Sequence, residues 1–83
     1  LGETTDSGIN IYPVPAKDFI NLKANSVIQS ADLIDVYGRL IFQTKFTDNS
    51  KEQGVELRSL NAGIYFIKIK TEAGEMTQKL ILE

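Results

Sequence analysis

The sequence predicts an all-β fold, a sandwich of about seven antiparallel strands in a single domain. Short runs of alternating apolar and polar residues are separated by turn segments with glycine, asparagine or serine, a pattern typical of antiparallel sandwiches. No stretch of ten residues shows the 3.6-residue period of an amphipathic helix. The alternation is densest in residues 60–82, so we expect a closing hairpin there that organises the rest of the chain.

A chain of 83 residues has the length of one small domain, which buries a modest fraction of its surface and is marginally stable. Residues 1–10 are rich in glycine and small polar side chains, which predicts a flexible linker from a preceding domain. The folded domain is then expected in residues 11–83. Because the first residue is Leu1 and no signal-peptide pattern follows, we expect a piece of a longer protein whose export signal lies upstream.

The alternating runs predict the individual strands. The segment 11–16 contains Pro13 and Pro15, which lack N–H donors, so we expect it at a sheet edge or in a polyproline conformation. Further strands are expected in residues 19–23, 31–36, 39–46, 55–57 and both arms of the closing hairpin. The polar stretch 47–54 is expected to be a loop.

A tight turn is expected at residues 35–38, where Gly38 supplies a positive φ. In the strand that follows, alternation predicts one shared face for Leu40, Phe42, Thr44 and Phe46. In the closing hairpin, a four-residue loop around residues 73–74 would place Thr71 opposite Met76. That register buries apolar against apolar residues, but it also sets Lys68 beside Lys79, an unfavourable like-charge pair.

Composition excludes several classes of function. The chain has no histidine and no cysteine, so it lacks the usual zinc ligands and cannot form a Ser-His or Cys-His nucleophile pair. The net charge of −2 gives no general attraction for nucleic acid or anionic membrane. No apolar run approaches the ~20 residues of a membrane-spanning helix. We therefore predict a protein that is not an enzyme and needs no cofactor.

Two groups of carboxylates are candidate sites. Asp32 and Asp35 are three residues apart in a predicted strand, which sends them to opposite faces and makes them a poor acid–base pair. Asp48, Asn49 and Glu52 lie together in the polar loop, but their spacing is not that of a calcium-binding loop. A solvated loop is the interpretation that the spacing favours.

Three segments, in this order, resemble the C-terminal sorting domain of the type IX (Por) secretion system of Bacteroidetes. They are Tyr12-Pro13-Val14-Pro15, then residues 35–41 (Asp-Val-Tyr-Gly-Arg-Leu-Ile), then residues 60–69 (Leu-Asn-Ala-Gly-Ile-Tyr-Phe-Ile-Lys-Ile) closing with residues 79–81 (Lys-Leu-Ile). The resemblance covers residues 11–83. The family usually carries asparagine between the two prolines, where this chain has Val14.

The resemblance implies an immunoglobulin-like sandwich that acts as a C-terminal secretion signal. Such a domain follows an upstream cargo domain in the same chain, and the cargo reaches the periplasm through an N-terminal signal. An outer-membrane translocon then recognises the folded domain. In many cargos a sortase-like peptidase removes it and attaches the cargo to the cell surface, whereas other cargos are released to the medium.

Candidate recognition residues are the cations Lys68, Lys70, Lys79 and Arg39, which a translocon with acidic groups would contact. The alternative is that they belong to a solvated sheet face and, for Arg39, a solvated strand end. If the last strand lies at a sheet edge, a partner would also be able to add a strand to it.

Structural roles are predicted for the remaining motif residues. Gly38 and Gly63 are expected at turns that need a positive φ or a close approach of the backbone. Tyr65 is expected in the core with its hydroxyl reaching a partner at the rim. The opening motif Tyr12, Pro13 and Pro15 is expected to begin the fold at an edge.

An immunoglobulin- or fibronectin-like accessory domain of a secreted enzyme is the alternative function, either a spacer or a carbohydrate binder. The chain has no tryptophan, which disfavours the aromatic platform of a carbohydrate-binding module. A further domain downstream of residue 83 would indicate such an accessory domain, whereas a sorting domain ends its chain.

Overall fold

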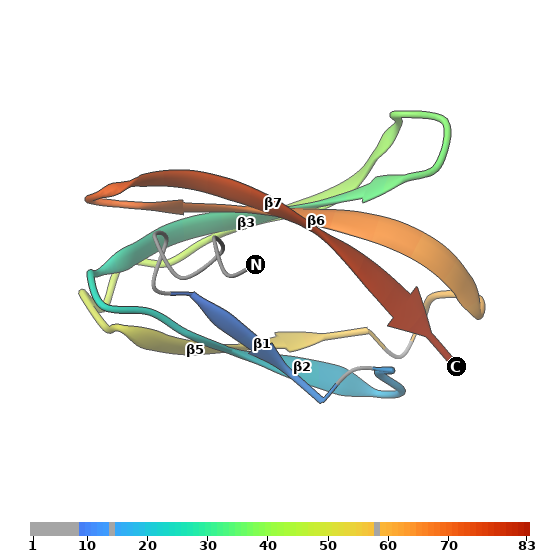
Figure 1. Cartoon of the computed structure of the whole chain (residues 1–83), viewed down its shortest axis with the longest axis horizontal. Coiled ribbons are helices and arrows are strands. Elements are labelled where there is room, and N and C mark those ends of the chain that lie inside the picture. The colour runs from blue at the N-terminus through green and yellow to red at the C-terminus, as the bar shows by residue number, and fades with distance from the viewer. Residues whose placement is uncertain (1–8, 14, 58) are drawn as a thin grey trace, which may run out of the picture.

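The computed structural model describes residues 9–13, 15–57 and 59–83 and folds them into two antiparallel sheets packed face to face (Figure 1). The strands are β1 (Asn10–Tyr12), β2 (Phe19–Lys23), β3 (Ile28–Asp35), β4 (Leu40–Lys45), β5 (Glu52–Glu56), β6 (Gly63–Thr71) and β7 (Gly74–Leu82). One sheet has the order β1-β2-β5 and the other has the order β4-β3-β6-β7. The predicted all-β sandwich is therefore confirmed.

The core lies between the two sheets and is built from the inward residues of alternating strands. Ile20 and Leu22 of β2 are fully buried, as their shared face predicts, and they meet Leu33, Ile67 and other residues of the facing sheet in one cluster. The largest fully buried side chains are Ile20, Leu22, Ile28, Leu33, Leu57, Ile67, Ile69 and Leu80. Burying one such side chain contributes about 1.5–3 kcal/mol, so this cluster dominates the stability of the domain.

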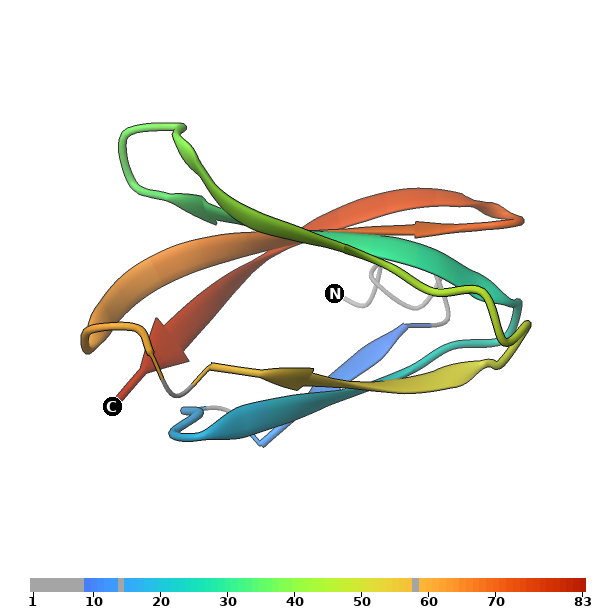
Figure 2. The ribbon, with the colours of Figure 1, turned by 180° about the vertical axis from the view of Figure 1, so that it is seen from behind.

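The edges of the sandwich are formed by β1 and β7 on one side (Figure 1) and by β4 and β5 on the other (Figure 2). The end of β7 is joined to Ala16, which makes a parallel bridge with Leu82. The Ala16 N–H donates to the Ile81 carbonyl (2.8 Å), and the Glu83 N–H donates to the Ala16 carbonyl (2.7 Å). These bonds fasten the last strand of one sheet to the segment that follows β1 of the other.

β1 lies at the edge of its sheet, as its prolines predict. It pairs with β2 alone, with Ile11 opposite Leu22, and Pro13 follows its last residue. The Tyr12–Pro13 peptide bond is cis. The strand begins at Asn10, the residue that the sequence assigned to the linker, and the rest of that linker together with Val14 lies outside the described residues, apart from Ile9.

Two further strands begin earlier than predicted. β3 begins at Ile28, three residues before the expected start, because Ile28 is fully buried and pairs with Thr71 of β6. β5 begins at Glu52, within the segment expected to be a loop, because its first residue pairs with Lys23 of β2. β5 is an edge strand with one face in solvent, so polar residues there do not prevent strand formation.

The predicted register of the β6–β7 hairpin is wrong by two residues. Thr71 lies opposite Gly74, not Met76, so the loop has two residues and Ile69 pairs with Met76. A slide of two residues leaves every side chain on its predicted face, so the hydrophobic pattern does not distinguish the two registers. The observed register removes the predicted Lys68–Lys79 pair: Lys68 lies opposite Thr77.

A β-bulge between β3 and β4 corrects a second prediction. Leu33 pairs with Phe42, whereas Ile34 pairs with Leu40, so Ile41 is an extra residue on β4. The extra residue reverses the alternation. Leu40 therefore lies on the exposed face instead of sharing the inward side of Phe42.

Candidate recognition surface

The outer face of the four-stranded sheet carries the predicted recognition residues. Cross-strand pairing arranges its polar side chains in two rows that run from β4 to β7. The rows are Lys45–Ser30–Lys70–Glu75 and Gln43–Asp32–Lys68–Thr77. These two rows form the half of the face next to the β6–β7 turn, and we call them the polar half-face.

The polar half-face pairs its charges internally. The ammonium group of Lys68 lies 3.5 Å from a carboxylate oxygen of Glu75, and Lys70 is directly opposite Glu75. The Gln43 amide donates to Asp32 Oδ1 at 2.9 Å. Two of the three predicted lysines therefore lie beside an acidic side chain, which lowers the positive potential that a partner would meet.

Lys79 is separate from the other two lysines. It lies in the next row, opposite Phe66 on β6, and its side chain is exposed. No ion pair joins it to another residue of the described ranges. The structure thus brings Lys68 and Lys70 together and leaves Lys79 at the edge of the sheet.

Arg39 closes the β3–β4 hairpin through a buried carboxylate. Asp35, 8% exposed, accepts hydrogen bonds at Oδ1 from the N–H groups of Tyr37 and Arg39, both at 2.9 Å. Its Oδ2 accepts the Arg39 Nε–H at 2.7 Å. The guanidinium carbon of Arg39 lies 5.4 Å from the centre of the Tyr37 ring, within the range of a cation–π contact.

The charge of Asp35 is held by these contacts. Burial raises the pKa of the Asp35 carboxyl, but hydrogen bonds from Arg39 and Tyr37, together with the positive charge of Arg39, outweigh burial and leave the pKa below its ordinary value. The carboxylate is therefore ionised whenever the domain is near neutral pH. Arg39 is a structural residue of the hairpin, with most of its guanidinium still facing solvent.

The glycine and tyrosine positions show why these residue types are needed. Gly38 ends the tight turn with φ of 84°, and its N–H donates to the Asp35 carbonyl at 3.0 Å. Gly63 begins β6 with φ of 152°. Tyr65 packs against the core, and its hydroxyl donates to the Asn61 carbonyl at 2.7 Å, which ties β6 to the preceding loop.

The opening motif lies on the opposite sheet, away from the lysines. Tyr12, Pro13 and Pro15 are exposed around the end of β1, and Ala16 after them is fully buried. Their placement fits an edge that guides the chain into the core at Ala16.

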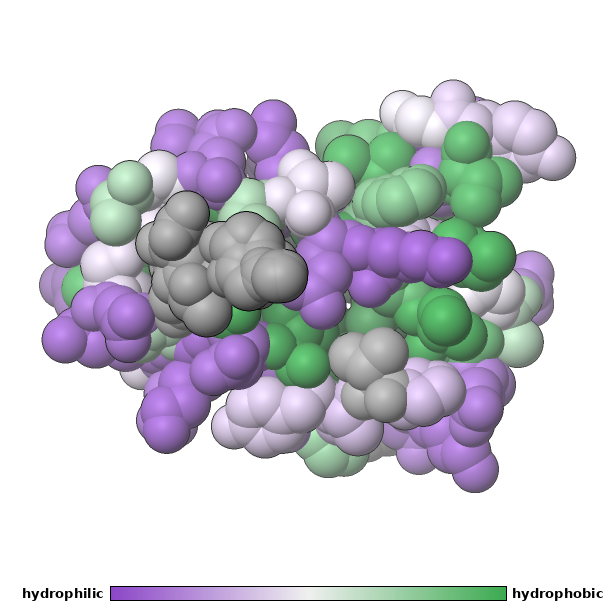
Figure 3. All heavy atoms as spheres, viewed as in Figure 1, coloured by the Kyte–Doolittle hydropathy of each residue, from purple (hydrophilic) through white to green (hydrophobic). Residues whose placement is uncertain are grey.

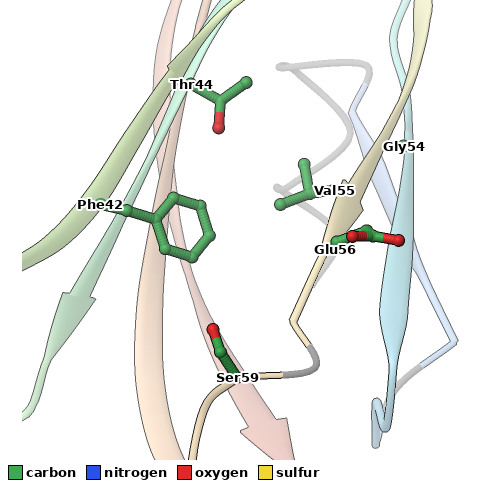
Figure 4. Close-up of a pocket in the computed structure, with 6 residues that line it drawn as sticks. All are labelled: Phe42, Thr44, Gly54, Val55, Glu56 and Ser59. Atoms are coloured by element: carbon green, nitrogen blue, oxygen red, sulfur yellow. The ribbon is translucent and has the colours of Figure 1, made fainter.

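A cleft opens where the edge strands β4 and β5 face each other (Figure 4). It has a volume of about 380 Å³ and is lined by Phe42 and Thr44 of β4, by Gly54, Val55 and Glu56 of β5, and by Ser59. Figure 4 shows Phe42 and Thr44 directed across the cleft toward Val55. Phe42 is the one aromatic residue of this lining, and Figure 4 shows the Glu56 side chain directed away from it.

The described residues show no arrangement for metal binding or membrane crossing. Within them, no three histidine, cysteine, aspartate or glutamate side chains come close enough to hold a metal ion. None of their segments forms a helix long and apolar enough to span a bilayer.

Comparison with known proteins identifies the family. Residues 10–83 match the model of the secretion system C-terminal sorting domain, a range that includes every strand from β1 to β7. The chain belongs to this family. It is therefore a C-terminal sorting domain, the secretion signal of the type IX system.

Two individual proteins are similar to this sorting domain. Beta-agarase D of Zobellia galactanivorans is 28% identical over 82 residues, which make up 98% of this chain and 16% of that protein. The crystal structure of CopC from Methylosinus trichosporium OB3b superposes with a TM-score of 0.58 over 90% of this chain and 93% of that one. At 13% identity the second likeness concerns the fold alone.

Two features of the surface were not predicted from the sequence. The sequence excluded Asp35 as half of an acid–base pair, but its role as the acceptor that closes a hairpin was missed, although aspartate before a tight turn is a known signal. The exposure of Leu40 was missed because a bulge leaves no clear mark in an alternating sequence.

Proposed function

We propose that the folded sorting domain is recognised in the periplasm by the outer-membrane translocon, which then exports the cargo. The observation that carries this proposal is the family match over residues 10–83, which coincides with a complete sandwich. The last strand is paired along β6 and fastened to Ala16, so the recognised form includes the end of the described chain. An unfolded tail would not present this surface.

A sortase-like peptidase is proposed to remove the domain after export in those cargos that become attached to the surface. The linker predicted in residues 1–10 is the proposed place for this cleavage. Peptidases cut accessible, unpaired segments, and a strand that is hydrogen-bonded within a sheet is not accessible to them. β1 begins at Asn10, which gives cleavage a folded boundary. The domain itself is proposed to be non-catalytic.

The cargo is proposed to be a secreted enzyme. The relative beta-agarase D carries its similar segment as 16% of a longer protein, and its name describes an enzyme that acts on agar. A polysaccharide-degrading enzyme is therefore the first class of cargo to look for upstream.

Fusion to a reporter tests the proposed function. Residues 1–83 would be placed behind a periplasmic reporter in a bacterium with a type IX system, and the reporter would be assayed in the cell envelope, on the surface and in the medium. We expect the reporter outside the cell, and its retention in the periplasm in a translocon-deficient strain. Export that is equal in the two strains would contradict the proposal, and retention in both would favour the accessory-domain alternative.

The cations are proposed to contribute to recognition, with Lys79 ahead of Lys68, Lys70 and Arg39. Lys68 and Lys70 lie beside Glu75, and Arg39 lies beside Asp35, so these cations already have an acidic side chain near them. Lys79 has no ion pair within the described residues, so it can bind a partner's carboxylate without first giving up an existing contact. The double variant Lys68→Gln/Lys79→Gln is expected to keep the Tm within a few degrees and to trap the reporter in the periplasm. Lys23→Gln/Lys51→Gln removes the same charge from exposed positions on β2 and just before β5, and it serves as the control. Normal display of the first variant would exclude the lysines.

Strand addition is proposed as a second mode of contact, because β7 is an edge strand. The Ile81 carbonyl and the Glu83 N–H point to the outer edge, where they bond to Ala16, so by alternation Thr77 and Lys79 point there too. Thr77→Pro would remove one outward N–H and leave the β6 ladder intact. Reduced export of Thr77→Pro beside normal export of Thr77→Ala would support strand addition, and equal export would exclude it.

A further inference from the structure

Exposed apolar residues gather at one end of the four-stranded sheet. The described chain has eight large hydrophobic residues that are exposed, and six belong to this end. They are Val36, Tyr37, Leu40, Ile41, Ile64 and Ile81. Tyr37 and Leu40 are the most exposed, at 81% and 57%, so the core does not account for their being apolar.

Strand pairing shows that these residues form one surface. Leu40 lies opposite Ile34 and Ile34 lies opposite Phe66, which makes an apolar row across β4, β3 and β6. Ile64 and Ile81 form the next row on β6 and β7. Together with the hairpin residues they constitute the apolar half-face: Ile34, Val36, Tyr37, Leu40, Ile41, Ile64, Phe66 and Ile81.

The outer face of a single sheet is thus divided in two. Figure 3 views the sandwich edge-on, and along its upper margin hydrophobic side chains lie near the base of the β3–β4 hairpin, on the right, whereas hydrophilic side chains lie on the left. Solvation alone would favour polar residues in both halves, because both lie on the same exposed side of the same strands. The apolar half-face therefore has a cause other than folding.

The size of the apolar half-face suits a protein interface. Taking roughly 200 Å² for a fully exposed large side chain, the six exposed residues present on the order of 600 Å². The largest apolar patch of a typical monomer is about 300–600 Å² and often functional. A standard interface takes about 800 Å² from each partner, which this patch reaches with its polar rim.

The hairpin that carries the most exposed residues is fixed in place. The Asp35 carboxylate binds the N–H groups of Tyr37 and Arg39 and the Arg39 side chain, with all three distances between 2.7 and 2.9 Å. Arg39 in turn stacks on Tyr37. A surface held in this way loses little conformational freedom on binding, which favours affinity.

The charges around the apolar half-face indicate the chemistry of the partner. Lys79 ends the row of Leu40, Ile34 and Phe66 and has no ion pair within the described residues. A partner that covered this row would remove water from the ammonium group, at a cost that a carboxylate opposite it offsets. The exposed guanidinium of Arg39 lies at the hairpin side and adds a second cation.

We propose that the apolar half-face is the docking surface for a folded protein of the secretion machinery, one that brings apolar side chains and a carboxylate to meet Lys79. This inference rests on the proposed function, since it names the surface that the secretion machinery binds when it recognises the sorting domain. It places the main contact on the β3–β4 hairpin and the C-terminal half of β7, and it leaves the lysines of the polar half-face a smaller part in recognition.

A matched pair of variants tests the docking surface in the reporter fusion. Leu40→Asp/Ile81→Asp changes the apolar half-face on β4 and β7, and Gln43→Asp/Thr77→Asp makes the same change on the polar half-face of the same strands. All four positions are exposed. Gln43→Asp also removes the hydrogen bond to Asp32 and sets two carboxylates opposite each other, so the thermal melting of this control is measured together with that of the first variant. Export of the first should fall about tenfold or more, as expected when interface anchors are lost, and export of the second should stay within about twofold.

The outcomes separate this inference from the proposed function. Export of the wild-type fusion together with undiminished export of Leu40→Asp/Ile81→Asp would overturn the docking surface alone. Failure of the wild-type fusion itself would overturn the proposed function and the inference with it. Because the reporter replaces the natural cargo, a loss of export in the variant also excludes the upstream cargo as the occupant.

Two further measurements cover folding and self-association. Thermal melting of the isolated 83-residue chain shows whether Leu40→Asp/Ile81→Asp folds. If that variant does not fold, Lys79→Glu is used instead, with Lys45→Glu as its control. Reduced export of Lys79→Glu supports a carboxylate on the partner, and normal export overturns the proposed contact of Lys79 with that carboxylate.

Sedimentation equilibrium should find the wild-type chain monomeric. A dimer that Leu40→Asp/Ile81→Asp dissociates would overturn the proposal in favour of a second copy.

Discussion

The two hairpins of the four-stranded sheet lie at its opposite ends (Figure 1). They also differ in the residues that they expose, which are apolar in the β3–β4 hairpin and polar in the β6–β7 hairpin. The β3–β4 hairpin is closed by the buried carboxylate of Asp35 and exposes Val36 and Tyr37. The β6–β7 hairpin is closed by a hydroxyl: the Ala73 N–H donates to Thr71 Oγ1 (3.1 Å), which donates to the Gly74 carbonyl (3.2 Å).

The difference shows how one sheet separates folding from recognition. Both turns satisfy their backbone groups with a side chain of the residue that ends the first strand, so both are stable turns by the same logic. A charge is used where the exposed residues are apolar, and a neutral hydroxyl is used where they are polar. The stronger fastening thus belongs to the hairpin that we propose as the docking element.

The largest loss of stability is expected in the core, where a strand of one hairpin pairs with a strand of the other. Ile67 of β6 is fully buried and pairs with Leu33 of β3, so it supports both hairpins. Ile67→Ala should cost about 2–5 kcal/mol of unfolding free energy, through lost burial and the cavity left behind. Urea denaturation followed by circular dichroism measures this loss.

Ile64→Ala is the matched control, because Ile64 lies three residues away on the same strand and is exposed. Its unfolding free energy should change by less than about 0.5 kcal/mol, as for other surface positions. Equal losses in the two variants would mean that the hairpins do not rest on a common core.

The second effect concerns the charge of Asp35. Asp35→Asn keeps the shape of the side chain but removes the ion pair with Arg39 and turns one acceptor into a donor. We expect a loss of stability at neutral pH that is smaller than that of Ile67→Ala. The unfolding free energies of wild type and variant, compared by urea denaturation at about pH 7 and about pH 3, measure it.

The pH dependence follows from the lowered pKa of Asp35 in the folded domain. The contribution of its charged form is complete above the unfolded pKa of about 4 and is lost as the pH falls through the lower, folded value. The difference between wild type and Asp35→Asn should therefore shrink from neutral to acidic pH. A difference that stayed constant would show that the charge of Asp35 does not hold the hairpin.

Sequence patterns predicted the parts of this fold that depend on which face a side chain occupies. The inward positions of β2, β6 and β7 follow from alternation alone, because burial distinguishes only odd from even residues. The tight turn at Gly38 also followed, since its positive φ excludes most other residues.

The strand register and the position of the bulge were not predictable from alternation, because they depend on which residues pair and not on which face a residue occupies. The slide of two residues in the β6–β7 register preserves every face, and its outcome rests on local bonds such as those of Thr71. The bulge at Ile41 reverses the alternation for Leu40 alone. The division of the outer face into two halves arises from both features together, so it became visible only in the structure.

A third, smaller loss of stability is expected at the β6–β7 turn, which is closed by the uncharged hydroxyl of Thr71. Thr71→Val keeps the volume of the buried side chain and removes the hydroxyl that binds Ala73 and Gly74. The loss should be about 1 kcal/mol, the net value of such a hydrogen bond, and it should be the same at neutral and acidic pH. A pH-dependent loss would contradict the distinction between the two fastenings.

The smallest effect should come from the ion pair on the polar half-face. Lys68 and Glu75 are 3.5 Å apart and each is about half exposed, so water and salt screen their attraction. Lys68→Gln should change the unfolding free energy by about 0.5 kcal/mol or less, and 1 M salt should remove even that difference. If Lys68→Gln alone also leaves reporter export unchanged while Lys79→Gln reduces it, recognition depends on the lysine beside the apolar half-face. The reverse result would move the recognition surface to the polar half-face, at the end of the sheet that carries the β6–β7 turn.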